Sequence, residues 1–352
     1  MRILLVRLRE IGDVVFTTPA VHALRDRFQD AHIDYLVEPA ASPVVTGSPY
    51  IDDVIVAPRG RGLPGFASDV ALGRQLRRHA YALAIDFHGG PRASLLTWLS
   101  GATERIGYAV PGRAWMYTRR VPRARTAAGR HSVINQWALL ESLGVPAPDP
   151  DQYPTAMALD ADSAGDVATR LAGAGASTSD RLIVMHVSAG NPFRRWPPAS
   201  FAAVAAALAG ASADRRVLVT SGPSEREAAA GVIAEARQLL AEGQRERILA
   251  AGEFSLAELR ALVDRAALYV GGDSGPAHVA STSRVPIVTL YGPTLPERSR
   301  PWRRASIRSA AVETHGLVCR PCDQRRCEPG DFRCLTHIEP RQVIEAAERL
   351  LQ

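Results

Sequence analysis

The chain reads LYVGGDSGPAHVA over residues 268–280, which predicts a short buried strand, a glycine turn and the start of a helix. Pro276 suits the first helical turn, because its missing N–H would be unpaired there. The glycines allow a sharp turn and the close approach of a ligand. Free N–H groups at such a helix start attract anions. With Asp273 and His278 flanking it, the stretch indicates either a site for a nucleotide-linked substrate or an ordinary strand-to-helix turn.

Similar strand–helix units recur on both sides of this stretch. Helical patterns separate the expected strands, which are 2–8, 33–37, 54–56, 81–87, 105–108, 182–186, 216–220, 248–249, 268–270 and 286–290. This alternation predicts an α/β protein with parallel sheets covered on both faces. Pro146, Pro148, Pro150 and Pro154 mark the best candidate linker. We therefore expect two doubly wound domains that meet near residue 150.

The composition is that of a soluble globular protein. The chain has 352 residues, of which 46% are hydrophobic and 22% charged. No apolar run approaches the roughly 20 residues that span a bilayer. The first residues lack the apolar core and cleavage site of a signal peptide. We therefore expect a cytoplasmic protein.

Arginine supplies all the basic residues, so chemistry through a lysine Schiff base is excluded. The net charge is +6. The segment between Arg59 and His131 contains thirteen arginines but only three acidic residues, which are Asp69, Asp86 and Glu104. Such a basic surface suits an acidic partner, such as nucleic acid, anionic lipid or an anionic sugar.

All four cysteines cluster, in the order Cys319, Cys322, Cys327 and Cys334. In a cytoplasmic protein, clustered cysteines favour a metal over disulfides. Four thiolates suit tetrahedral zinc or iron, although this spacing matches no common zinc ribbon closely. A structural Zn or Fe, disulfides and free thiols remain open.

The first strand is followed by LREIGD, residues 8–13, and not by G-x-G-x-x-G. This disfavours a nicotinamide dinucleotide at its usual place. Asp13 begins the next helix, where an acid is either a favourable helix partner or a functional group. In the second half, the loops after four strands are expected to converge on one crevice, and they are 186–197, 221–225, 252–255 and 271–280.

Several short motifs follow one another along the chain. They are Val6-Arg7-Leu8, Gly12-Asp13-Val14, Thr18-Pro19-Ala20, Asp86-Phe87-His88-Gly89, Arg194-Arg195-Trp196-Pro197, Asp273-Ser274-Gly275-Pro276-Ala277-His278, Val285-Pro286 and Leu290-Tyr291-Gly292-Pro293-Thr294. In their order and spacing the chain resembles glycosyltransferase family 9, the bacterial heptosyltransferases, from end to end.

This resemblance implies a GT-B fold, with two Rossmann-like domains facing a central cleft. It implies an inverting enzyme that needs no catalytic metal or other cofactor and moves heptose from ADP-heptose to an inner-core acceptor of lipopolysaccharide. Residues 1–150 would bind the acceptor, and 151–338 the nucleotide sugar. The helix within 339–352 would pack back on the N-terminal domain.

The resemblance also implies roles for individual residues. Asp13 would be the general base, and an ordinary aspartate is already ionised at neutral pH. Arg194 stands where the family usually has lysine, which keeps the charge but changes its geometry. Residues expected to bind the donor are Ser188, Arg194, Glu225, Asp273, Ser274, Gly275, Pro276 and His278.

The basic first domain is expected to hold the phosphates and carboxylates of lipid A and the core oligosaccharide. The residues expected at the acceptor are Arg59, Arg61, His88, Arg92, Arg119 and Arg120. The same patch would bring the enzyme to the anionic cytoplasmic face of the inner membrane. Trp115 and Tyr117 would sit at the lipid interface.

Three alternatives stay open. A family member can use another donor sugar, or a protein or other glycan as acceptor. A binding-only paralogue is disfavoured by the presence of Asp13. A basic nucleic-acid-binding protein with a four-cysteine metal knuckle comes from a different class, but the basic segment lacks a recognisable nucleic-acid motif, so no nucleic-acid partner is expected.

Overall fold

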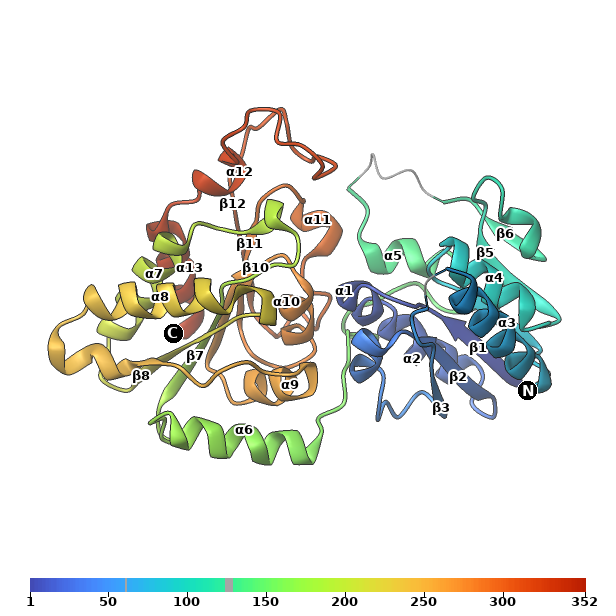
Figure 1. The fold of residues 1–352 in the computed structure, drawn as a ribbon, viewed down its shortest axis with the longest axis horizontal. Helices are drawn as coiled ribbons and strands as arrows, with labels where there is room; N and C mark the ends of the chain where they lie inside the picture. The colour runs from blue at the N-terminus through green and yellow to red at the C-terminus, as the bar shows by residue number, and fades with distance from the viewer. Residues whose placement is uncertain (61, 124–128) are drawn as a thin grey trace. The chain divides into compact units, whose positions relative to one another are not determined.

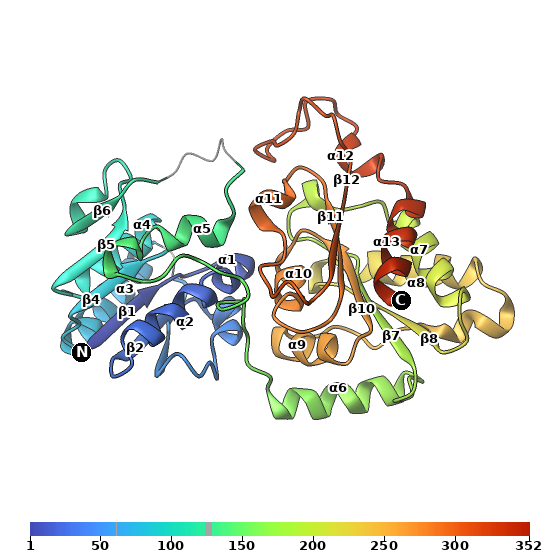
Figure 2. The same ribbon diagram turned by 180° about the vertical axis from the view of Figure 1, so that it is seen from behind.

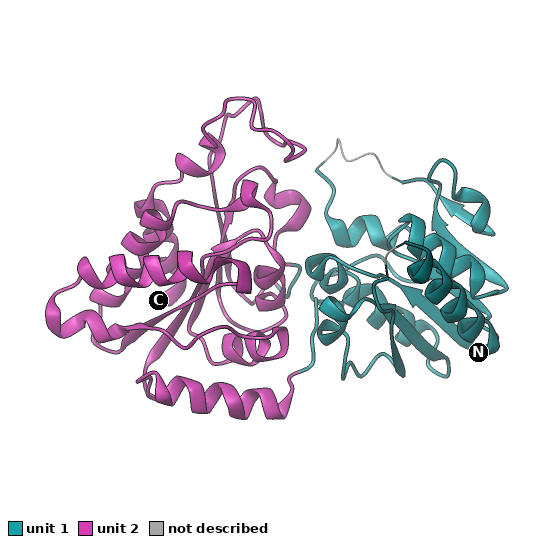
Figure 3. Ribbon diagram, in the orientation of Figure 1, with its two compact units in different colours: residues 1–158, 302–304 teal, residues 159–301, 305–352 magenta. Residues whose placement is uncertain are grey.

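The computed structural model describes residues 1–60, 62–123 and 129–352. Contacts divide the chain into two compact units, shown in teal and magenta in Figure 3. Unit 1 consists of Met1–Ala158 with Trp302–Arg304, and unit 2 of Leu159–Pro301 with Ala305–Gln352. Each unit contains one six-stranded parallel sheet with helices around it (Figures 1 and 2). The predicted α/β class is confirmed.

Unit 1 has the strand order β3-β2-β1-β4-β5-β6. The strands are β1 (Arg2–Val6), β2 (His32–Val37), β3 (Asp53–Val56), β4 (Leu83–Asp86), β5 (Glu104–Tyr108) and β6 (Arg119–Val121). The helices are α1 (Ile11–Val15), α2 (Thr18–Arg27), α3 (Gly62–Arg78), α4 (Pro91–Leu99) and α5 (Ser132–Trp137), with 3-10 turns η1 (Pro39–Val44), η2 (Ala114–Met116) and η3 (Glu141–Leu143). Leu4 and Val6 of the central strand pack with Leu76 of α3 and Leu96 of α4.

Unit 2 has the strand order β12-β11-β10-β7-β8-β9. The strands are β7 (Arg181–His186), β8 (Arg215–Thr220), β9 (Ile248–Leu249), β10 (Leu268–Gly272), β11 (Ile287–Tyr291) and β12 (Ser309–Glu313). The helices are α6 (Ala161–Gly173), α7 (Pro198–Gly210), α8 (Arg226–Gln238), α9 (Leu256–Asp264), α10 (Gly275–Ala280), α11 (Pro296–Ser299), α12 (Arg333–Thr336) and α13 (Pro340–Leu351), with 3-10 turns η4 (Pro192–Arg194), η5 (Pro223–Glu225) and η6 (Glu242–Arg247). The core joins β7, β8 and β10 to α7, α8 and α13.

Both sheets follow the same plan. Taken along the chain, the strands of each unit stand in the order 3-2-1-4-5-6 or its reverse. The order changes direction between β1 and β4 in unit 1, and between β7 and β10 in unit 2. We call these two places the switch points. Ligands of such sheets bind outside the carboxyl ends of the strands at the switch point, so the loops after β1, β4, β7 and β10 are where a site is expected.

Two edge strands, β6 and β12, were not expected from the sequence. The C-terminal helix corrects a further expectation. Helix α13 belongs to unit 2, where Val343, Ala347 and Leu350 join the core, so the expectation that it packs on the N-terminal domain is wrong. The segment of the C-terminal half that belongs to unit 1 is Trp302–Arg304.

The proline-rich stretch packs into unit 1 and is not a free linker. The indole N–H of Trp137 donates to the Pro146 carbonyl at 2.7 Å. The Tyr153 carbonyl accepts from the Trp302 indole at 2.9 Å, and the Thr155 N–H donates to the Trp302 carbonyl at the same distance. The units therefore divide after Ala158, beyond the boundary expected near residue 150.

Candidate active site

Asp13 lies at the switch point of unit 1, in α1, which follows β1. Its carboxylate forms an ion pair with the Arg7 guanidinium, whose Nη1 also donates to the Phe87 carbonyl after β4 at 2.9 Å. Arg7 is buried, whereas the Asp13 side chain is 38% exposed. Glu10, just before α1, has a φ of 67°. Such backbone costs a non-glycine residue about 1–3 kcal/mol and tends to occur at functional sites.

A buried carboxylate shapes the loop after β4. Asp86 Oδ1 accepts from the backbone N–H groups of His88 and Gly89 at 2.8 and 2.9 Å, and Oδ2 accepts from the Tyr117 hydroxyl at 2.6 Å. Burial, and then the charges of Arg7 and Arg9, lower the pKa of His88 to about 4. The imidazole is therefore neutral at neutral pH, where it can donate or accept one hydrogen bond without carrying charge.

The arginines expected to bind the acceptor differ in whether an acidic side chain already pairs with their charge. Arg92 is engaged with Glu38 and Asp69 at 2.7 and 2.8 Å, so it holds unit 1 together rather than offering a free cation. Arg119 pairs with Glu104 at 2.7 Å. Arg59 and Arg120 are exposed, and Arg61 lies outside the described residues.

The two aromatic residues expected at a lipid interface differ in their exposure. Trp115 is 57% exposed and stacks edge-on with Trp98, which is partly exposed as well. Tyr117 is buried, and its hydroxyl is bonded to Asp86 and Ser94, so its expected place at the interface is wrong. Among the described residues, no helix has both the length and the apolar character that a membrane crossing requires.

The switch point of unit 2 brings Arg194 and Asp273 together. Asp273 follows β10, and Arg194 ends η4, which follows β7. Arg194 Nη1 donates to the Asp273 carbonyl at 3.0 Å and lies 3.6 Å from Asp273 Oδ2. A Cβ on Gly272 would lie 3.2 Å from the Arg194 carbonyl oxygen. Gly272 lies within β10 and not in a turn, so turn geometry does not explain the glycine. The close approach of the η4 segment favours glycine here instead.

Asp273 is almost fully buried, but its partners favour the ionised form. The Thr294 hydroxyl donates to Oδ2 at 2.6 Å, and His278 Nε2 lies 3.4 Å from Oδ1. Burial alone raises the pKa of Asp273. The hydrogen bond and charge of His278, the charge of Arg194 and the Thr294 hydrogen bond outweigh it, so the pKa is lowered. Asp273 is therefore a buried acceptor with fixed orientation.

Helix α10 begins directly after this carboxylate, with Gly275 and Pro276 in its first turn. It has only six residues, shorter than the sequence suggested. Ser274 is the extended residue before it and does not cap it. Its Oγ is buried and has no hydrogen-bond partner among the described residues. Because buried polar atoms are nearly always paired, this hydroxyl is a candidate contact for a bound molecule.

The loops after β7 and β8 are joined through Ser188. Its Oγ lies 2.9 Å from His186 Nε2 and accepts from the Gly222 N–H at 2.8 Å. Glu225 ends η5 after β8 and is buried, with its Oε1 paired to Arg195 at 2.5 Å. All the residues expected to bind a donor thus lie in unit 2 on loops that follow β7, β8 and β10, or in the first turns of α10.

A sequence profile described as glycosyltransferase family 9 (heptosyltransferase) matches residues 70–329. The chain belongs to glycosyltransferase family 9. It is 28% identical to lipopolysaccharide heptosyltransferase 3 of Escherichia coli over 98% of this chain and 97% of that protein. A family 9 glycosyltransferase from Veillonella parvula DSM 2008 superposes with a TM-score of 0.83 at 26% identity, over 99% and 97% of the two chains. Escherichia coli ADP-heptose lipopolysaccharide heptosyltransferase II does so at 0.77 and 20%, over 100% and 98%. The predicted GT-B fold is confirmed.

Three residues of this glycosyltransferase contact the expected site residues, although no role for them was predicted from the sequence. Thr294 bonds Asp273 and Arg195 pairs with Glu225. Both lie in quoted family motifs, so those motifs could have drawn attention to them. Gln324 bonds Arg194 at 2.8 Å. Its partner lies far away in the sequence, and no local pattern indicates that contact.

The cysteines of the family 9 chain line a single pocket. Cys319, Cys322, Cys327 and Cys334 surround it together with Phe193 and Phe332, and all four thiols are free. Among the described residues, however, no three of these sulfurs all lie within 4.8 Å of one another, as a closed metal site would require. Burial, and then the nearby cysteines, raise the pKa of the Cys334 thiol to about 11. The ligand set suits a tetrahedral thiolate site, but its geometry is open.

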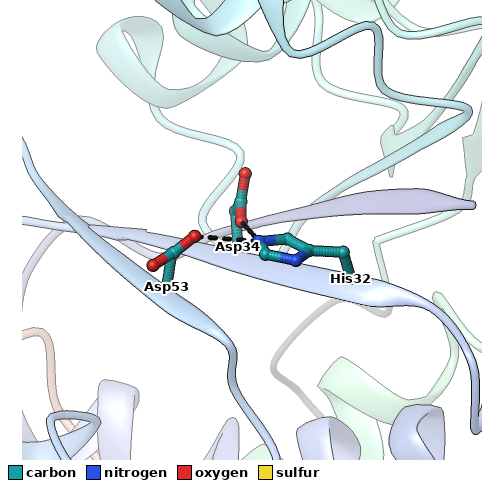
Figure 4. A group of neighbouring side chains, drawn as sticks. All are labelled: His32, Asp34 and Asp53. Atoms are coloured by element: carbon teal, nitrogen blue, oxygen red, sulfur yellow. Dashed lines mark hydrogen bonds and ion pairs between the residues drawn. The ribbon is translucent and has the colours of Figure 1, made fainter.

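A second group of potential ligands lies at the opposite ends of the unit 1 strands. His32 Nε2 is 2.9 Å from Asp34 Oδ1 and 2.8 Å from Asp53 Oδ2 (Figure 4). Asp34 and Asp53 are register partners on β2 and β3, so their like charges repel. Arg2 lies 3.2 Å from Asp34 and 3.9 Å from Asp53. Because Arg2 supplies the positive charge, we interpret the group as an ion-pair network that stabilises the sheet.

Proposed function

We propose that this family 9 glycosyltransferase transfers heptose from ADP-heptose to an inner-core acceptor of lipopolysaccharide. The proposal is supported by its relative in Escherichia coli, described as lipopolysaccharide heptosyltransferase 3, and by the similar fold of the ADP-heptose lipopolysaccharide heptosyltransferase II. The observation that carries it is the arrangement at the switch point of unit 2, where Arg194 is fixed against Asp273.

Unit 2 would bind the donor. Arg194 supplies positive charge for the diphosphate, and the unpaired Ser274 hydroxyl supplies a hydrogen bond. Asp273, ionised and held by Thr294, would accept from sugar hydroxyls. Glu225 would accept from the ribose hydroxyls through its second carboxylate oxygen, while Oε1 pairs with Arg195. His278 would act through Asp273, which it orients.

Unit 1 would bind the acceptor and supply the base. The acceptor hydroxyl gives its proton to the Asp13 carboxylate as its oxygen bonds to the anomeric carbon. The bond between that carbon and the phosphate oxygen breaks with its electron pair, and ADP leaves. In-line displacement inverts the anomeric centre. Arg194 stabilises the negative charge that develops on ADP, the task that a metal ion performs in other transferases.

The exposed parts of unit 1 support an acidic acceptor. Arg59 and Arg120 are exposed cations, and His88 is a neutral hydrogen-bonding group beside Arg7. Trp115 and Trp98 present aromatic surface, and Arg113 lies in the same segment as Trp115. Arginine and tryptophan together suit an anionic membrane surface. We therefore infer peripheral contact with the lipid A region at the cytoplasmic face.

The test is to incubate the purified protein with ADP-heptose and a truncated core acceptor. We expect release of ADP, a product heavier by one heptose, and inversion at the anomeric carbon as seen by NMR. ADP-glucose and a non-lipid glycan acceptor serve as comparisons. Transfer only from another sugar, or only to another acceptor, would move the chain to a different specificity within the family. A folded protein that binds no ADP-sugar would overturn the proposal.

We also propose that the four cysteines hold a structural zinc or iron ion. Support comes from four free thiols on one pocket, a ligand set that both metals accept. The ion would fix the loop and would take no part in the transfer. Elemental analysis of protein purified without chelator tests this. A folded sample without metal would overturn it.

A further inference from the structure

The segment from Cys319 to Cys334, here called the cysteine loop, is anchored to the loop that carries Thr294. The Arg320 Nε and Nη2 donate to the Thr294 carbonyl at 3.1 and 2.5 Å, and Nη1 pairs with Glu313. The Cys322 N–H donates to the Pro293 carbonyl at 3.3 Å. The Thr294 hydroxyl in turn donates a hydrogen bond to the Asp273 carboxylate at the switch point. Thr294 therefore connects the cysteine loop to that carboxylate.

Beyond this anchor, the loop reaches Arg194 through one side chain. Gln324 Oε1 accepts from Arg194 Nε at 2.8 Å and from Asn191 Nδ2 at 2.9 Å. Gln324 is half-buried and has a φ of 59°, in the left-handed region. Arg194 Nη1 meanwhile donates to the Asp273 carbonyl at 3.0 Å. The guanidinium is therefore held at two of its nitrogens, by the cysteine loop and by the residue after β10.

We propose that Gln324 is a positioning residue, which fixes the Arg194 guanidinium for the diphosphate of the donor. This inference rests on the proposed function. An unrestrained arginine side chain loses rotamer entropy when a ligand fixes it, and a guanidinium already held in place loses less. The remaining N–H groups of the fork then face one direction when the phosphates arrive.

The chemistry of an amide suits this task better than that of a carboxylate. An amide oxygen accepts from Arg194 Nε and leaves the positive charge uncompensated. A glutamate at the same place would hold the guanidinium as well, but it would neutralise the charge that the phosphates need. Geometry and charge can therefore be separated by substitution at one position.

The experiment measures ADP affinity by titration calorimetry, and kcat and KM for the sugar donor, with the full-length protein. Gln324→Ala removes the contact. Gln324→Asn is the sharper variant, because asparagine tolerates left-handed backbone and yet is too short to reach Arg194. We expect both to raise the Kd for ADP about three- to tenfold, which is the usual effect of losing one ordinary hydrogen bond. The donor KM should rise with it, while the acceptor KM stays unchanged.

Gln324→Glu should weaken ADP binding through charge although it keeps the acceptor oxygen, and raising the salt concentration should reduce this defect. Arg325→Ala is the matched control, since this exposed neighbour pairs only with Asp323 among the ion pairs of the described residues. It should bind ADP as the wild type does. Thermal unfolding of each variant shows whether the fold is intact.

The decisive comparison uses an Arg194→Ala background. If Gln324 acts through Arg194, adding Gln324→Ala there changes ADP affinity no further. An equal loss in both backgrounds, or wild-type affinity of Gln324→Asn in the native background, would overturn the inference while the proposed function stands. If the folded wild-type protein binds no ADP, the proposed function fails, and this inference fails with it.

Discussion

Arg7 ties Asp13 to the neighbouring strand of the unit 1 sheet. One guanidinium nitrogen pairs with the Asp13 carboxylate, and the other donates to the Phe87 carbonyl after β4 at 2.9 Å. The Asp13 carboxylate, which is proposed as the base, is thus held by the buried guanidinium of Arg7, and this guanidinium contacts the segments on both sides of the switch point. Its orientation is set before any acceptor binds.

Asp13→Asn keeps the size of the side chain but removes its ability to take a proton. We expect kcat to fall by about a hundredfold or more, the usual contribution of a general base, while ADP affinity stays at the wild-type value. Asp26→Asn, at a partly exposed aspartate of the same unit, is the control. Transfer by Asp13→Asn at the wild-type rate would refute the assignment.

Arg7→Lys keeps the positive charge but cannot reach both partners with a planar fork. Arg7→Met removes the charge as well. We expect kcat to fall in the order wild type, lysine variant, methionine variant, with a loss of about tenfold for lysine because Asp13 is less well oriented. Single-turnover rates with saturating donor measure this. If both variants react alike, the charge contributes nothing and only the orientation matters.

Thr294→Val removes the hydroxyl that donates to Asp273 and nearly preserves the volume. The buried carboxylate loses one partner, so we expect the donor KM to rise about fivefold, a loss of roughly 1 kcal/mol. Thr282→Val is a matched control, since among the described residues its hydroxyl donates to the backbone carbonyl of Val279 and to no site residue. Steady-state kinetics at saturating acceptor separate the two. Equal KM values for both variants would remove Asp273 from the donor site.

Burial lowers the pKa of His186 to about 4 from a reference value of 6.5. As pH falls from 6.5 to 4, the unfolded chain takes up a proton that the folded chain does not. Stability should therefore decrease over this window by up to about 1.4 kcal/mol per pH unit, and it should be fully retained above pH 6.5. Denaturant titrations at several pH values measure the slope, to which His88, with its pKa also lowered to about 4, contributes in the same window. His186→Gln should reduce the slope without abolishing it, whereas His315→Gln, at an exposed site, should leave it unchanged.

The cysteine loop gives a prediction about metal. If an ion holds the loop, chelation should lower Tm and weaken ADP binding together, because the same loop carries Gln324. Zinc or iron added back should restore both. A quadruple Cys→Ser variant should show the chelated behaviour from the start. Unchanged Tm and ADP affinity after chelation would exclude a metal that supports this loop.

Local patterns predicted much of the fold. The buried runs at β1 and β7 and the Ser255–Glu258 capping box are readable within a few residues, and the capping box is confirmed at 2.6 and 3.2 Å. Helix α10 was placed correctly but drawn too long. The α-helical pattern ends at Ala280, because the amides of Thr282 and Ser283 bond to carbonyls three residues earlier and their hydroxyls bond to the same carbonyls.

Distant contacts explain what the sequence did not reveal. Arg92 looked like a free cation, and its partners Glu38 and Asp69 come from other elements. Tyr117 lies in an irregular basic stretch, and only the fold shows that Asp86 buries its hydroxyl. The Arg194–Gln324 contact joins residues that are 130 positions apart in the sequence. Side chains meeting over such separations leave no periodic trace.

The return of Trp302–Arg304 to unit 1 limits how this enzyme can be divided. The chain passes from one unit to the other three times, after Ala158, Pro301 and Arg304. A fragment that ends at Ala158 would lack the indole that bonds Tyr153 and the carbonyl that bonds Thr155. A hybrid that combines the first half of one heptosyltransferase with the second half of another would inherit a mismatched partner there. Exchanging the first half of the chain between relatives therefore calls for moving residues 302–304 together with it.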